Sequence, residues 1–91
     1  MPEVRTLDEF ETAETLDKKG VWMRVAGEHG DYVWSLCPKC GCRSALRIGG
    51  QLHPKWEIVI DQPLTLIPSI QHNAEWCGWH GYLRNGEFVD A

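Results

Sequence analysis

The chain has 91 residues, of which 43% are hydrophobic and 24% charged, and its formal net charge is −4. This composition is typical of one small folded domain and excludes a disordered chain, and no apolar run reaches the roughly 18–20 residues of a membrane span. The acidic balance argues against general electrostatic binding to nucleic acid. The first 20 residues lack the basic start and apolar stretch of a signal peptide, so we expect a cytoplasmic protein.

The first predicted element is a short helix over residues 7–18. Thr6 and Glu9 have the spacing of a capping box, apolar residues recur at helical spacing after them, and Gly20 is placed to end the helix. Six of the first 20 residues are acidic. The sequence therefore divides into an acidic N-terminal helix or arm, residues 1–20, and a β domain, residues 21–91.

After Gly20 the apolar pattern changes to the alternation that is typical of strands. Asn85-Gly86 between two short apolar runs predicts a closing hairpin with a type I′ turn. The fold class we expect is mainly β: a small antiparallel β domain built around a zinc site, with a short N-terminal helix. The expected strands cover residues 21–25, 32–36, 45–48, 56–60, 64–67, 82–84 and 87–89.

Four cysteines with paired spacing indicate a metal site rather than disulfides in a cytoplasmic chain. Cys37-Pro38-Lys39-Cys40-Gly41 is a knuckle whose tight turn directs two thiolates at one ion, and Cys77-Gly78-Trp79-His80 supplies a second pair. The predicted Zn²⁺ ligands are Cys37, Cys40, Cys77 and His80. Cys42, two residues after Cys40, could replace it.

Other candidate groups favour structural interpretations. His29, His53 and His72 are expected at the surface or in turns rather than as ligands. Ser69 lacks the flanking glycines of a nucleophile elbow, so we expect it to form a hydrogen bond beside the metal. Cys77 with His80 could form a nucleophile and base, but a ligand pair is the preferred interpretation, and no catalytic residue is predicted.

Charge and aromatic content suggest how such a protein would contact a partner. Residues 36–56 contain four basic side chains and no acidic one, and with Trp56 this segment could contact nucleic acid. The chain has five tryptophans, more than a small core readily buries, so at least one of Trp22, Trp76 and Trp79 is expected to face outward and bind a protein.

The order of these motifs resembles a family of small uncharacterised zinc-binding proteins of phages and bacteria. The resemblance rests on the Cys37–Cys42 knuckle, on Leu64-Thr65-Leu66-Ile67-Pro68-Ser69-Ile70, on Cys77-x2-His80 and on the Asn85-Gly86 hairpin, and covers about residues 32–90. Lys39 is an extra residue in the knuckle compared with the family pattern. The resemblance implies zinc binding and a phage or prophage origin, and some relatives are encoded beside bacterial ubiquitin-like conjugation genes.

The function we expect is that of a phage-type accessory protein with structural zinc that acts by binding a host or phage protein. Two alternatives remain: a nucleic-acid-binding zinc protein, and a zinc-dependent hydrolase. A closed set of four ligands would favour a binding module, and an open coordination position would favour a hydrolase.

Overall fold

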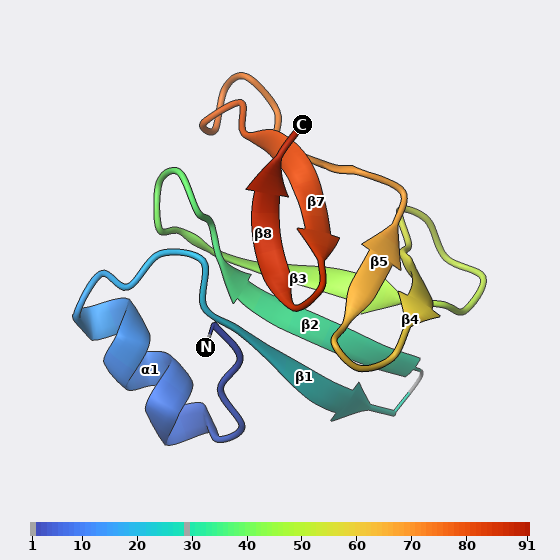
Figure 1. Cartoon of the computed structure of the whole chain (residues 1–91), viewed down its shortest axis with the longest axis horizontal. Helices are drawn as coiled ribbons and strands as arrows, with labels where there is room; N and C mark the ends of the chain where they lie inside the picture. Colours follow the sequence, from blue (N-terminus) through green and yellow to red (C-terminus); the bar gives the residue numbers. More distant parts are fainter. Residues whose placement is uncertain (1, 29) are drawn as a thin grey trace.

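A computed structural model of the chain describes residues 2–28 and 30–91. Within these residues one helix, α1 (Leu7–Thr15), precedes eight strands that form three antiparallel sheets (Figure 1). The predicted fold class, mainly antiparallel β with a short N-terminal helix, is confirmed. His29 lies outside the described residues. The described residues form no helix long and apolar enough to cross a membrane.

The central sheet forms the middle layer of the molecule. Its strands are β1 (Trp22–Gly27), β2 (Gly30–Leu36) and β3 (Arg43–Ile48), each antiparallel to the next. Val33 of β2 and Cys37, which directly follows this strand, belong to one core cluster, whereas Leu36 belongs to the other and Trp34 packs against that second cluster. Because side chains alternate between the two faces of a strand, this one sheet supports a hydrophobic core on each side.

Two smaller sheets cover one face of the central sheet (Figure 1). One pairs β4 (Glu57–Ile60) with β5 (Thr65–Ile67), and the other has the order β6 (Ile70–Gln71), β7 (His80–Arg84) and β8 (Glu87–Asp90). The β7–β8 turn has positive φ at Asn85 (53°) and Gly86 (79°), as the predicted type I′ turn requires.

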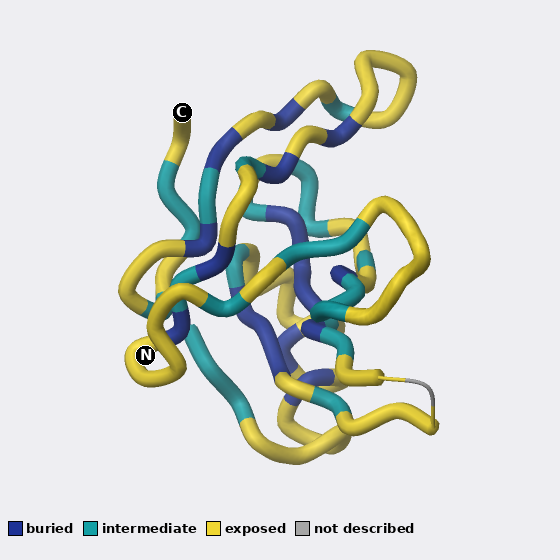
Figure 2. Tube along the Cα trace, turned by 90° about the vertical axis from the view of Figure 1, so that its right-hand side faces the viewer, coloured by how far each residue is buried: buried dark blue, intermediate teal, exposed yellow. Residues whose placement is uncertain are grey.

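The main core lies between the central sheet and the two smaller sheets. Its buried members come from all three sheets and from the segments that join them: Trp22, Val33, Cys37, Leu46, Leu64, Leu66, Ile70, Trp79 and Leu83. Figure 2 shows the buried residues along the trace, inside a more exposed periphery. β6 and β7 are therefore both anchored in the main core, through Ile70 and Leu83, and the loop that joins the two strands extends to the surface.

Helix α1 packs on the opposite face of the central sheet. Phe10 and Ala13 are buried there against Val21, Met23 and Leu36. The capping box predicted from Thr6 and Glu9 is present at its start.

The helix ends earlier than expected because the chain reverses at Asp17, which has φ 55°. The Lys18 N–H donates to the Ala13 carbonyl and the Asp17 N–H to the Glu14 carbonyl, the hydrogen bonds of a Schellman motif. Asp17 thus takes the left-handed position that the sequence assigned to Gly20, and the prediction of a helix through residue 18 was wrong.

A candidate metal centre beside a serine–histidine pair

The turn of residues 37–42 directs backbone N–H groups toward a buried sulfur. Cys37 follows β2 directly, and the Lys39 and Cys40 N–H groups point at its Sγ at 3.4 and 3.5 Å. Hydrogen bonds from Cys37 N–H to the Cys42 carbonyl and from Gly41 N–H to the Cys37 carbonyl close the turn. Gly41 has φ +80°, a conformation that side chains rarely adopt, and the turn is therefore a preformed site for a thiolate.

The loop of residues 72–79, between β6 and β7, brings two further donors to this sulfur. Its ends are joined by a 2.8 Å hydrogen bond from the His72 N–H to the Trp79 carbonyl. Inside the loop, the Trp76 and Gly78 N–H groups both donate to the Asn73 carbonyl. The resulting fold of the loop turns His72 and Cys77 toward Cys37.

The donor atoms of Cys37, His72 and Cys77 lie at the separations of ligands on one ion. The Cys37 and Cys77 sulfurs are 3.6 Å apart, and the His72 Nδ1 is 3.3 Å from the first and 3.4 Å from the second. Sulfurs bound tetrahedrally to zinc, each about 2.3 Å from it, would be about 3.8 Å apart. The three residues are therefore close enough to hold a metal ion.

Cys40 lies next to these three residues and is the fourth member of the cysteine–histidine cluster. Its thiol interacts with the thiols of Cys37 and Cys77, and also with that of Cys42. Burial raises the pKa of the Cys40 thiol, but the Cys42 N–H and the neighbouring thiols outweigh burial and lower this pKa to about 7. Cys42 itself is exposed. A thiol with a lowered pKa is more readily available as a thiolate ligand.

The two most buried members of the cluster are also suited to binding a cation. Burial lowers the pKa of His72, so its ring is neutral and can donate a lone pair near neutral pH. Burial raises the pKa of Cys37, because a thiolate without a counterion is costly in an apolar environment. A bound cation would supply that counterion.

Of the four predicted ligands, the structure brings Cys37 and Cys77 together with Cys40 beside them, and it places His72 rather than His80 next to these thiols. His72, expected at the surface, is only 7% exposed and stacks on Trp76 with ring centroids 3.7 Å apart. His80 lies outside the cluster, with its Nε2 3.1 Å from the Ser69 Oγ. The Cys77-x2-His80 spacing suggested a ligand pair, but His80 already belongs to β7, where it points to the outer face.

The Ser69–His80 pair results from the register of β6 against β7. Ile70 pairs with Gly81 and Gln71 with His80, and the buried Ile70 and Gly81 define the inner face of the two strands. Ser69 and His80 are then diagonal neighbours on the outer face, a separation that a long side chain can bridge. The Trp56 indole N–H points at the Ser69 carbonyl at 3.4 Å and helps to hold the serine backbone.

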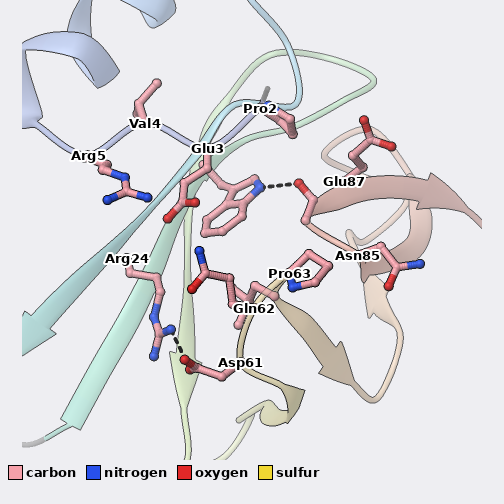
Figure 3. A pocket seen from close by; sticks show the side chains of 13 residues that line it. Pro2, Glu3, Val4, Arg5, Arg24, Asp61, Gln62, Pro63, Asn85 and Glu87 are labelled. Carbon is pink, nitrogen blue, oxygen red and sulfur yellow. Dashed lines mark hydrogen bonds and ion pairs between the residues drawn. The ribbon is translucent and has the colours of Figure 1, made fainter.

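The Ser69–His80 pair lies near the surface of the molecule. His80 is exposed and Ser69 half-buried, and His80 borders a shallow depression of about 430 Å³ that Lys39, Trp79 and Asp90 also line. A deeper pocket of about 380 Å³ lies elsewhere, at the β7–β8 turn, with Trp22 and an Arg24–Asp61 ion pair in its wall (Figure 3). His53 is exposed in a turn, as predicted.

Two groups of polar side chains lie close together: the cysteine–histidine cluster, in which Cys37, His72 and Cys77 are close enough to hold a metal ion, and the Ser69–His80 pair. With Cys40 as a fourth donor the metal site would be closed, which is the pattern of structural zinc. A serine hydroxyl 3.1 Å from an imidazole nitrogen is within the range of a nucleophile and its general base. Sequence reasoning missed this pair because no motif surrounds Ser69; the pair depends on the register of a two-residue strand.

No curated protein and no solved structure matches the chain significantly. The model of one protein family, described as bacterial ubiquitination-like system serine protease (BubE), matches residues 7–91. This match overturns the expectation of a phage accessory protein that acts by binding alone, since the family is described as a bacterial protease. The match also includes helix α1, which the resemblance to small zinc-binding proteins left out. With almost its whole length matched, the chain belongs to the BubE family of bacterial ubiquitination-like system serine proteases.

Proposed function

We propose that this protein is a serine protease whose nucleophile is Ser69 and whose general base is His80. The observation that carries the proposal is the 3.1 Å contact between the Ser69 Oγ and the His80 Nε2 on an exposed face. The family description supports it, because it names a serine protease. Proteins of a bacterial ubiquitination-like system are the substrates that we propose.

The reaction would proceed in two steps. The Ser69 Oγ attacks the carbonyl carbon of the scissile bond while its proton passes to the His80 Nε2. The His80 imidazolium then returns this proton to the leaving amine, which gives an acyl-serine. In the second step His80 takes a proton from water, the hydroxide releases the acyl group, and the proton returns to Ser69.

The open surroundings of the Ser69–His80 pair fit a protein substrate. A small substrate would require a cavity that encloses it, whereas a folded protein can present an extended segment to an exposed serine. The shallow depression beside His80 leaves room for such a segment. The protein partner expected from the sequence is, in this proposal, the substrate itself.

Zinc is the ion that we propose for the cysteine–histidine cluster. Cys37, Cys40, Cys77 and His72 would hold it, and three thiolates with one imidazole form a donor set that zinc prefers. When bound, the ion contributes folding energy and joins the 37–42 turn to the 72–79 loop. A zinc-dependent hydrolase would require an open coordination position, which this set of four donors does not leave.

Hydrolysis of an activated ester and of a peptide by the zinc-loaded protein tests the proposal. Ser69→Ala and His80→Ala should each lower kcat/KM by about 10³-fold or more, and the double variant should be no worse than either, because the two groups act as a unit. His53→Ala, at an exposed histidine in a turn, is the matched control and should keep the full rate. A Ser69→Ala variant that hydrolyses peptide at the wild-type rate would exclude Ser69 as the nucleophile.

A further inference from the structure

We propose that His72 and Cys77 are positioning residues, which hold Ser69 and His80 at reacting distance through the metal that they bind. This inference rests on the proposed function of the Ser69–His80 pair. It assigns to the metal centre a mechanical role in catalysis that is distinct from folding of the main core.

The chain connects the two sites over very short segments. Ser69 precedes His72 by three residues, and His80 follows Cys77 by three residues. The 72–79 loop therefore carries a proposed ligand close to each end. One end continues into β6, which Ser69 directly precedes, and the other into β7, of which His80 is the first residue. Three residues of extended chain span about 10 Å, so a displacement of either ligand would also displace the neighbouring strand.

The strand pairing that sets the register is weak by itself. β6 consists of Ile70 and Gln71, and each pairs with one residue of β7. A two-stranded ladder of this length is at best marginally stable in water without further support. Core packing of Ile70 and Trp79 supplies part of that support on the inner face.

Hydrogen bonds within the 72–79 loop shape the loop but do not attach it to the rest of the molecule. The Asn73 carbonyl accepts from the Trp76 and Gly78 N–H groups, and the Asn73 Oδ1 also accepts from the Trp76 N–H at 2.8 Å. A link to the 37–42 turn comes from the Lys39 Nζ, which donates to the Cys77 carbonyl at 2.9 Å on an exposed side chain. An exposed, flexible lysine fixes a loop weakly.

The metal ligands make the firm connection. Cys37 is 1% exposed at the end of β2, so an ion bound to it is fixed to the central sheet. The same ion would bind His72 and Cys77 and so hold both ends of β6–β7 relative to that sheet. The Cys37 sulfur lies 3.3 Å from the His72 Nδ1 and 3.6 Å from the Cys77 sulfur. Without a cation no single atom would bind all three groups, and ionised thiolates at this distance would repel one another.

Insertion of one glycine between Gly78 and Trp79 separates the two roles of the metal. Gly78 is exposed, and the nearest atom to a Cβ added there would be 3.9 Å away, so the loop is loosely packed at this point. All four ligands stay in the chain, but the link from Cys77 to His80 becomes longer. The matched control is a glycine inserted between Gly49 and Gly50, where nothing lies within 4 Å of an added Cβ.

Three measurements follow on zinc-loaded full-length protein: zinc per chain, the rate at which a fluorophosphonate labels Ser69, and hydrogen exchange of the Ile70 and Gly81 amides. In the Gly78–Trp79 insertion variant we expect zinc to be retained and the two amides to exchange faster. Labelling of Ser69 should be slower by about 10²-fold, because a misplacement of a reacting group by about 1 Å costs about that factor in rate. The control insertion should match the wild type in all three. Chelation of the metal should speed exchange at these amides and slow labelling.

The outcomes distinguish this inference from the proposed function. Wild-type labelling at Ser69 together with equally fast labelling of the Gly78–Trp79 insertion variant would overturn the positioning role and leave the serine protease intact. If Ser69 of the wild type is not labelled, the proposed function is wrong. Unchanged exchange at Ile70 and Gly81 after chelation would also overturn the positioning role, whether or not the protein hydrolyses substrate.

Discussion

Burial and strand position, rather than spacing from a cysteine, decide which groups the two histidines at the ends of the 72–79 loop contact. His72 directly follows β6 and lies against Trp76 and Trp79, which leaves its Nδ1 directed at two sulfurs. His80 is the first residue of β7 and faces outward to Ser69. The Cys77-x2-His80 spacing could not predict this, because it does not show where the strand begins.

Replacing each of these histidines tests their assignment. His72→Ala should lower the zinc content well below one equivalent per chain and lower the melting temperature, because it removes a donor and leaves a gap beside Trp76. His80→Ala should retain zinc. Elemental analysis of protein purified without added metal checks both, and zinc retained in His72→Ala but lost in His80→Ala would restore the ligand set predicted from the sequence.

Variants of Cys40 and Cys42 test which of the two thiols binds the ion. Cys40→Ser should weaken zinc binding and stability, since its thiol contacts two other members of the cluster and has a pKa of about 7. Cys42→Ser should have the smaller effect, since Cys42 is exposed and only its thiol contact with Cys40 is lost, while its N–H, which bonds the Cys40 sulfur, remains. Competition with a chromophoric chelator measures both affinities. Equal losses in the two variants would contradict the assignment of Cys40.

At the scale of elements, charge that was uneven along the sequence is partly neutralised in space. Arg43 at the start of β3 makes two hydrogen bonds to Glu14 of α1, at 2.7 and 3.2 Å, and its guanidinium lies over the rings of Phe10 and Trp34. Arg43 of the basic segment and Glu14 of the acidic helix therefore form an ion pair. Local patterns predicted both segments but could not show that they meet.

Docking of α1 on the central sheet gives a prediction for stability. Phe10 is fully buried against Val21, Met23 and Leu36, so Phe10→Ala should lower the free energy of unfolding by about 3–5 kcal/mol. Leu16→Ala, at a residue that is 59% exposed, is the matched control and should cost little. Chemical denaturation of the zinc-loaded protein measures both. Equal effects would mean that the helix does not pack as described.

Elements with a strong local signal were predictable, and those that depend on distant contacts were not. Alternating apolar residues predicted β1 and β4, short runs bounded by turn residues predicted β2, β3 and β5, and Asn85-Gly86 predicted the β7–β8 hairpin. β6 was missed, because two residues are too few to show alternation and the strand exists only through its pairing with β7. The Ser69–His80 pair depends on that strand, which is why this pair was missed while the three thiols of the cysteine–histidine cluster were found.

For the whole molecule, the cysteine–histidine cluster joins segments that are distant in the sequence. Cys37 and Cys77 are 40 residues apart, and their sulfurs are 3.6 Å apart. In a domain this small, with a modest core, a metal that joins such segments contributes much of the folding free energy. The same ion would lie between the central sheet and the β6–β7 strands, next to Ser69, the proposed nucleophile.

Acid should therefore release the metal and destabilise the fold. The pKa of Cys40 is lowered to about 7 and that of Cys37 is raised, and both thiols must lose their protons to bind zinc. The metal-dependent part of the stability is fully present in mildly alkaline solution and is lost as the pH falls and these sulfurs are protonated. Zinc release followed against pH with a chromophoric chelator measures this, and an affinity that is constant between pH 8 and pH 5 would contradict it.

The central claim, that Ser69 is a nucleophile activated by His80, is tested most directly by trapping the acyl-enzyme. Zinc-loaded protein is incubated with an activated ester, quenched in acid, digested and mapped by mass spectrometry. We predict one acyl group on Ser69 in the wild type and a greatly reduced yield in His80→Ala. An acyl group on Cys42 or another thiol, or turnover of the ester without any acylation of Ser69, would contradict the claim.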